Sequence, residues 1–158
     1  LLPKEGFGPV PWRDILKNRK GFSLLELLIV VAIILIIATI AIPSLLRSRQ
    51  AANESAAVGN MRNLNTAQVS YSSTNGTYGS MNDLITARLI DDRYNNANFN
   101  GYRITVALSN MNRNYTAYAT GVSVNTSRYD YYSGPDFVIR YSTAITRAPS
   151  GMTGDPVN

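Results

Sequence analysis

The sequence contains no cysteine and no histidine, and its three lysines all precede residue 21. Without cysteine, neither a disulfide framework nor a thiolate metal site can form. Histidine is the commonest general acid or base and a frequent metal ligand, so its absence argues against hydrolytic and metal chemistry. The adjacent carboxylates Asp91 and Asp92 fit a solvated turn better than a catalytic pair. We therefore expect no enzymatic activity, no cofactor and no metal site.

Charge is also scarce, at 16% of the 158 residues against a usual value of about 25%. The shortage is local, because Glu26 is the only ionisable residue between Phe22 and Ile42. About 20 apolar residues suffice for a helix to cross the hydrocarbon core of a bilayer. The sequence therefore predicts one membrane-spanning helix, followed after Pro43 by a polar domain.

The net charge of +5 is concentrated at the N-terminus, where residues 1–20 carry five cations and two acids. Lys17, Arg19 and Lys20 directly precede the apolar run. This positive-inside pattern predicts a cytoplasmic N-terminus and an exported domain at a bacterial inner membrane. The remainder holds ten arginines and eight acids. Arginines interleaved with tyrosines would suit DNA, but a net charge of +2 gives nucleic acid only weak support as a partner.

The apolar run is longer than the core of a secretory signal, and no small-residue cleavage site closes it. Two possibilities remain: the segment is an uncut signal anchor, or the chain is cut on the cytoplasmic side of the apolar run. The cytoplasmic edge of the apolar run reads Arg19-Lys20-Gly21-Phe22-Ser23-Leu24-Leu25-Glu26-Leu27. This segment closely resembles the processing site of type IV prepilins and related pseudopilins. The resemblance implies that a prepilin peptidase cuts after Gly21 and methylates the new N-terminal residue, Phe22. It also implies assembly, through an inner-membrane platform, into a homo-oligomeric filament outside the cell.

A carboxylate inside a membrane helix is costly, which singles out Glu26 as a functional residue. Glu26 lies four positions after Phe22, about 6 Å along a helix, so its side chain could snorkel to the lipid headgroups. Alternatively, the cut creates a positive amine on Phe22, and Glu26 of one subunit neutralises the amine of its neighbour, as a buried charge requires. The resemblance assigns the glutamate this same role in subunit docking.

Pro43 either marks the end of the membrane span or interrupts a longer helix. Helical periodicity resumes after it, because apolar residues recur at spacings of 4, 3, 3 and 4 in the set Ala57, Met61, Leu64, Ala67 and Tyr71. We therefore expect one helix from residue 22 to about residue 73, with the apolar face of its second half on a sheet. The charged residues on that half should face solvent or a neighbouring subunit; they are Arg47, Arg49, Glu54 and Arg62. The resemblance makes Pro43, with Gly59 as a second weak point, a site of helix plasticity.

Three later runs alternate as strands do: 102–109, 115–124 and 137–142. The predicted fold class is α+β, a long N-terminal helix on an antiparallel sheet of three to four strands, which is the pilin fold. The expected divisions are a cleaved leader (1–21), a transmembrane and assembly helix (22–43), its amphipathic half (44–74), a globular part (75–148) and a flexible tail (149–158).

The ten tyrosines lie between residues 71 and 141. Tyrosine is common on half-buried sheets; a functional interpretation instead makes Tyr129, Tyr131 and Tyr132 an exposed adhesive or subunit-contact surface.

The leading interpretation is a type IV pilin for adhesion, motility or DNA uptake. A pseudopilin of a type II secretion system and a monomeric membrane-anchored binding module are the alternatives. The acidic calcium loop of major pseudopilins has only a thin counterpart here, in Asp130 and Asp136.

Overall fold

The computed structural model describes residues 21–142 and 155–157. The chain divides into two compact units, Leu1–Ala41 and Ile42–Asn158. The leader residues Lys17, Arg19 and Lys20 lie outside the described residues. In chain order the elements are α2 (Leu24–Asn75), α3 (Met81–Thr86), the 3-10 helix η1 (Asp92–Asn95), β1 (Tyr102–Ser109), β2 (Asn114–Gly121), β3 (Asp130–Ser133), β4 (Arg140–Ser142) and β5 (Asp155–Pro156).

The predicted long helix is confirmed as α2, which spans 52 residues and contains Pro43. Its N-terminal part has the length and composition of a membrane-crossing helix. The side chains of that part are exposed in the isolated chain, apolar ones included. Such a surface needs lipid or another apolar partner to cover it.

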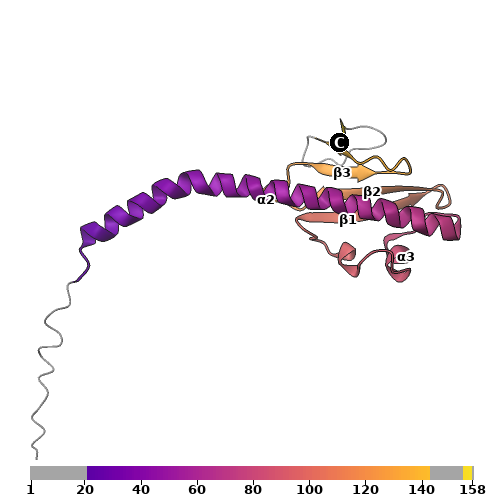
Figure 1. The fold of residues 1–158 in the computed structure, drawn as a ribbon, viewed down its shortest axis with the longest axis horizontal. Coiled ribbons are helices and arrows are strands. Elements are labelled where there is room, and N and C mark those ends of the chain that lie inside the picture. The colour runs from indigo at the N-terminus through magenta and orange to yellow at the C-terminus, as the bar shows by residue number, and fades with distance from the viewer. Residues whose placement is uncertain (1–20, 143–154, 158) are drawn as a thin grey trace, which may run out of the picture. The chain divides into compact units, whose positions relative to one another are not determined.

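The second half of α2 lies across the sheet, as Figure 1 shows. Ala57, Met61, Leu64 and Ala67 are all buried, which confirms the predicted apolar face. They join a core to which β1 contributes Tyr102 and Ile104 and β2 contributes Tyr115, Ala117 and Ala119. A polar contact also crosses this layer. The Tyr115 hydroxyl donates to Asn65 Oδ1 over 2.9 Å, and Asn65 Nδ2 donates to Ser133 Oγ over 2.9 Å.

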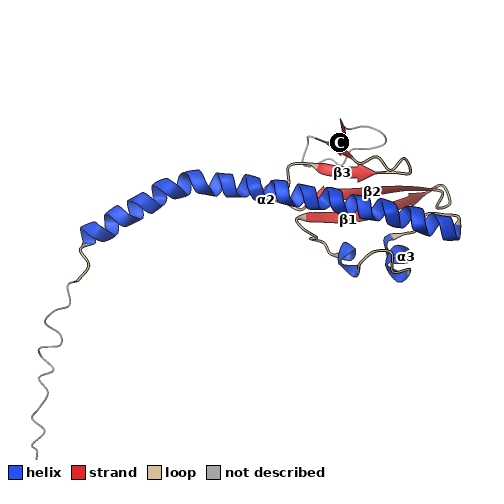
Figure 2. Ribbon diagram, viewed as in Figure 1, coloured by secondary structure: helices blue, strands red, loops and turns tan. Residues whose placement is uncertain are grey.

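The strands form one antiparallel sheet in the order β1-β2-β3-β4-β5, so each strand pairs with its neighbour in sequence (Figure 2). The β1–β2 hairpin runs in register from Tyr102 opposite Gly121 to Ser109 opposite Asn114. Its connection holds Asn110, Met111 and Asn112 at positive φ. Asparagine tolerates this left-handed region better than most residues.

The segment between helix and sheet is fixed by side-chain caps. Ser80 and Asp83 form a capping box at the start of α3. Asp91 caps η1 and pairs with Arg93 over 3.0 Å, so the predicted solvated turn is confirmed. Gln68 of α2 both donates to the Gly79 carbonyl and accepts from the Gly79 N–H, over 2.7 and 3.0 Å. The residue thus holds the turn after α2 against the helix that precedes it.

The sheet differs from the prediction most at β3, a strand that the sequence did not indicate. All four residues of Asp130–Ser133 are buried, so both faces of this strand are covered. Tyr131 and Tyr132 are therefore core residues, and Tyr129 is half-buried. The interpretation of these tyrosines as an exposed adhesive surface is wrong, because they pack within the sheet instead. The Tyr131 ring lies 5.9 Å from that of Tyr102.

Two predicted strands are shorter than expected, and the tail contributes a strand. The run 115–124 pairs only as far as Gly121, because the chain then enters a turn at residues 123–126. Phe137 has a φ of 59°, which is incompatible with a strand, and β4 begins only at Arg140. In the predicted flexible tail, Asp155–Pro156 pairs with β4, and the Val157 N–H donates to the Ile139 carbonyl over 2.8 Å. The other tail residues, 149–154 and 158, lie outside the described residues.

Two glycines give a matched test of packing. A Cβ built on Gly121 would lie 1.8 Å from Ser127 Oγ and 2.9 Å from Ser127 Cβ, whereas one on Gly59 would meet nothing within 4 Å. Gly121→Ala should lower the free energy of unfolding by about 1–3 kcal/mol through overpacking. Gly59→Ala should raise it by about 0.5–1 kcal/mol through helix propensity. Thermal unfolding of the full chain in detergent micelles, followed by circular dichroism, checks both; an unchanged midpoint for Gly121→Ala would contradict this packing.

Candidate functional site

The segment around the predicted cut begins with Gly21, Phe22 and Ser23 in non-helical backbone, directly before α2. All three residues are exposed, and a Cβ on Gly21 would meet nothing within 4 Å. Glu26 lies in the first turn of α2, also exposed in the isolated chain. The predicted scissile bond therefore lies in exposed, non-helical backbone, and the helix starts two residues after it.

The side chains of Ser23 and Glu26 accept hydrogen bonds from backbone N–H groups at the start of the helix. The Ser23 N–H donates to Glu26 Oε2 over 2.9 Å, and the Leu25 N–H donates to Ser23 Oγ over 3.3 Å. These two bonds satisfy N–H groups that the first helical turn leaves without partners. The sequence reasoning missed Ser23, although the Ser-x-x-Glu spacing is a recognisable signal for a capping box.

The two predicted plasticity sites lie inside α2, which is helical through both. Pro43 has no N–H to donate, so the helix lacks one hydrogen bond there. Gly59 is half-buried and offers no side chain to the packing. Unwinding at either residue stays a prediction.

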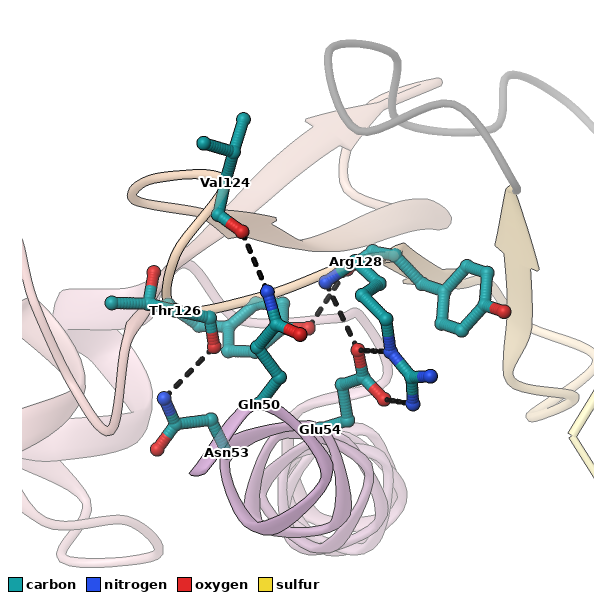
Figure 3. A network of polar contacts seen from close by, with 8 residues as sticks. Gln50, Asn53, Glu54, Val124, Thr126 and Arg128 are labelled. Carbon is teal, nitrogen blue, oxygen red and sulfur yellow. Dashed lines mark hydrogen bonds and ion pairs between the residues drawn. The ribbon is translucent and has the colours of Figure 1, made fainter. Parts of the chain in front are cut away.

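A second polar cluster joins α2 to the connection between β2 and β3, and we call it the polar clasp (Figure 3). Gln50 Nε2 donates to the Val124 carbonyl over 2.7 Å, and Asn53 Nδ2 donates to the Thr126 carbonyl over 2.8 Å. Glu54, one helical turn after Gln50, forms an ion pair with Arg128. The clasp therefore consists of three consecutive contacts between one helix face and one loop.

Glu54 is the buried member of the clasp, with 7% of the residue exposed. Its Oε1 accepts from the Arg128 backbone N–H over 2.9 Å and from Arg128 Nε over 3.0 Å, while Oε2 accepts from Arg128 Nη2 over 2.7 Å. These hydrogen bonds to the carboxylate raise the pKa of Arg128 above its already high ordinary value. The expectation that Glu54 faces solvent is wrong, whereas Arg47, Arg49 and Arg62 are exposed as predicted.

The loop of the clasp is closed at its base by Asp130. Asp130 is fully buried, and its Oδ1 accepts from the Gly121 N–H over 2.8 Å, while Oδ2 has no hydrogen-bond partner among residues 21–142 and 155–157. Burial raises the pKa of Asp130, and the bond from Gly121 offsets part of that rise. Asp136 is engaged elsewhere, in an ion pair of 2.6 Å with Arg140. The two acids considered for a calcium loop thus have separate structural partners.

Glu54→Gln should lower the free energy of unfolding by about 1–3 kcal/mol, because it leaves Arg128 without its carboxylate. Asp91→Asn is the matched control, since it removes one charge of the exposed pair with Arg93. Such surface pairs contribute about 0–1 kcal/mol. Urea unfolding of both full-length variants measures the difference. Equal stability of the two variants would show that the clasp contributes no more than a surface pair.

Asp130→Asn gives a test with a defined pH dependence. The pKa of Asp130 is raised above its ordinary value of 3.8, so the protonated carboxyl favours the folded state over the unfolded state. Stability from this residue is present at low pH and is lost as pH rises through the raised pKa. The variant cannot titrate but keeps an acceptor for Gly121, so it should melt above the wild type at pH 7. That difference should disappear below about pH 3.5; a lower melting temperature for the variant at pH 7 would contradict the assignment.

Comparison with known proteins locates similarity in the N-terminal part of the chain. Residues 16–42 match the family model described as the prokaryotic N-terminal methylation motif. The chain is 42% identical, over 65 residues, to the type IV wide pilus major component PilA4 of Thermus thermophilus, a match that covers 41% of this chain and 50% of that protein. It is 39% identical, over 91 residues, to the type IV major pilin protein PilA of Myxococcus xanthus, covering 57% and 39%.

The chain thus spans half or less of the length of these two curated relatives. The match to the methylation motif includes the predicted cut, Glu26 and the apolar run. The structure adds a long helix packed on an antiparallel sheet. The chain therefore carries the prokaryotic N-terminal methylation motif, and the described part of the chain combines a long helix with an antiparallel sheet, as in a pilin-like α+β fold.

Proposed function

We propose that this chain is a structural subunit of a type IV pilus, and that its role is assembly rather than catalysis. A prepilin peptidase removes residues 1–21, methylates Phe22 and leaves α2 as the membrane anchor. An inner-membrane platform then transfers the subunit into a homo-oligomeric filament. The filament serves adhesion, motility or DNA uptake. Both curated relatives are described as pilus proteins, which supports the proposal.

The observation that carries the proposal is the juxtaposition of an open Gly21-Phe22 bond with a carboxylate one helical turn away. Cleavage at that bond creates a positive amine beside an otherwise apolar helix. Glu26 supplies the only negative charge in the apolar run. A charge can enter an apolar filament core only with a partner, so Glu26 of one subunit pairs with the Phe22 amine of the next.

Before assembly the same helix anchors the subunit in the inner membrane. The basic leader keeps the N-terminus in the cytoplasm, and the sheet domain lies on the exported side. Lipid covers the apolar side chains of residues 24–42 at this stage, and neighbouring helices cover them in the filament. The isolated subunit and the filament thus use one apolar surface with two successive partners.

Three variants separate charge pairing from helix capping. Glu26→Gln removes the charge but keeps an acceptor for the Ser23 N–H, Glu26→Ala removes both, and Ser23→Ala removes only the hydroxyl of the cap. In a host with type IV pilus machinery, Glu26→Gln and Glu26→Ala should be processed but yield no filaments. Ser23→Ala should assemble, although its first helical turn is weaker by about 1 kcal/mol.

Mass spectrometry of the mature N-terminus and electron microscopy of sheared cell-surface material provide the measurements. The wild type should begin with methylated Phe22. A mature protein that retains the Lys20-Gly21 bond would contradict processing, and normal filaments from Glu26→Gln would contradict charge pairing.

A further inference from the structure

Two valines stand exposed on the turn that follows β2. The exposed fraction is 45% for Val122 and 61% for Val124. The turn that carries them is fixed, because the Thr126 N–H donates to the Ser123 carbonyl over 3.0 Å and the Ser123 N–H donates to Thr126 Oγ1 over 3.1 Å. The Val122 N–H also donates to the Gly101 carbonyl over 3.0 Å. A preorganised turn therefore presents two apolar side chains to the surroundings.

The polar clasp sets the direction of this turn along α2. Helix residues 50, 53 and 54 bind loop residues 124, 126 and 128 in the same order. Figure 3 shows these contacts following one face of the helix. Since the lowest-numbered loop residue binds the lowest-numbered helix residue, the valines lie toward the end of the domain that contains Pro43.

The helix segment and the turn at this end of the domain carry more positive than negative charge. In residues 43–54 and 121–130 the only acids are Glu54 and Asp130. Arg128 neutralises Glu54, and Asp130 is fully buried. Arg47 and Arg49 are exposed, and among the described residues neither has an acidic partner. Two free cations therefore lie on the helix between Pro43 and the clasp.

We propose that Arg47, Arg49, Val122 and Val124 form a lipid-facing rim that rests on an anionic bilayer surface while the subunit is anchored. This inference depends on the membrane anchoring of the proposed function. Arg47 follows Ile42, the last residue of the apolar run, by five residues, or about 7.5 Å of helix rise. The headgroup layer on each side of a bilayer is about 5–8 Å thick. Arg47 thus lies at the headgroups. Arg49 lies about 10.5 Å beyond Ile42, and its long side chain can extend back to them. An ordinary helix tilt of about 20° brings one side of the domain closer.

Charge favours lipid over a second copy of the chain as the occupant. In a symmetric contact between two rims, each would meet the same surface of its partner, which would bring like charges together. An anionic headgroup layer attracts the arginines. The clasp holds Val124 level with Gln50, so the two valines face the outer part of that layer on the side toward which the helix tilts. The rim would therefore hold the domain against the membrane until assembly withdraws it.

The absence of cysteine allows a direct test with single labelling sites. Asn125 is exposed at the centre of the turn, and Met111 is exposed at the opposite end of the β1–β2 hairpin. Full-length Asn125→Cys and Met111→Cys proteins, labelled with a nitroxide, are placed one copy per nanodisc. The discs contain either phosphatidylcholine alone or phosphatidylcholine with about a third phosphatidylglycerol. Electron paramagnetic resonance then compares label accessibility to lipid-soluble oxygen and to a water-soluble nickel chelate.

We expect the oxygen-to-nickel accessibility ratio at position 125 to rise at least twofold when phosphatidylglycerol is present, while position 111 remains aqueous. Adding Arg47→Gln and Arg49→Gln should abolish the dependence on phosphatidylglycerol. Adding Val122→Ser and Val124→Ser instead should reduce the ratio in both types of disc.

Two results would overturn the rim. One is a label at position 125 as aqueous as that at position 111, and the other is lipid-like accessibility found only in discs with two copies of the chain. A third label, Ile34→Cys in the apolar run, separates the rim from the anchor. A lipid-exposed label at position 34 with an aqueous label at 125 rejects the rim alone. An aqueous label at position 34 rejects membrane anchoring and the rim with it.

Discussion

The buried carboxylate of Glu54 is the constraint on which the rest of the domain depends. A charge enclosed between a helix and a loop is tolerated only when its hydrogen-bonding capacity is met, and here a single residue, Arg128, meets it with backbone and guanidinium together. This ion pair fixes the loop after β2 on α2, and the chain continues from Arg128 into β3, the strand that is buried on both faces. A stacking contact continues the network, because the Arg128 guanidinium lies 5.4 Å from the centre of the Tyr129 ring.

Beyond Glu54, α2 organises the domain through side-chain amides as much as through apolar packing. Gln50 and Asn53 bind carbonyls of the β2–β3 connection, Asn65 links β2 to β3, and Gln68 holds the turn at Gly79. The contacts of Asn65 and Gln68 are buried, and loss of a buried hydrogen-bond partner costs about 1–3 kcal/mol. A domain without disulfides can thus hold irregular loops on one helix, and the same helix continues into the apolar anchor.

The limits of prediction from sequence follow from how far apart the interacting residues lie. The apolar period of α2 and the alternation of β1 are local patterns, and both were predicted correctly. Glu54 and Arg128 are 74 positions apart, so no local pattern marks Glu54 as buried. β3 has only four residues, all of them buried, so it shows no apolar–polar alternation that would predict a strand. The cap at Ser23 is a local signal, because Ser-x-x-Glu before an apolar run is typical of a helix N-terminus. Phe137 was placed within a strand because alternation carries no information about its positive φ.

The cap formed by Ser23 and Glu26 also bears on why assembly would require a charged residue at position 26 rather than any hydrogen-bond acceptor. In the isolated chain one carboxylate oxygen of Glu26 accepts from the Ser23 N–H. Within the part of the chain that the structure describes, the other oxygen accepts no hydrogen bond, so a carboxylate can cap its own helix and pair with a neighbouring amine at once. A glutamine oxygen has two lone pairs and could still accept both hydrogen bonds, but it carries no charge and would leave the amine's charge uncompensated in an apolar core. On the proposed function, Glu26 therefore links helix initiation within one subunit to recognition of the next.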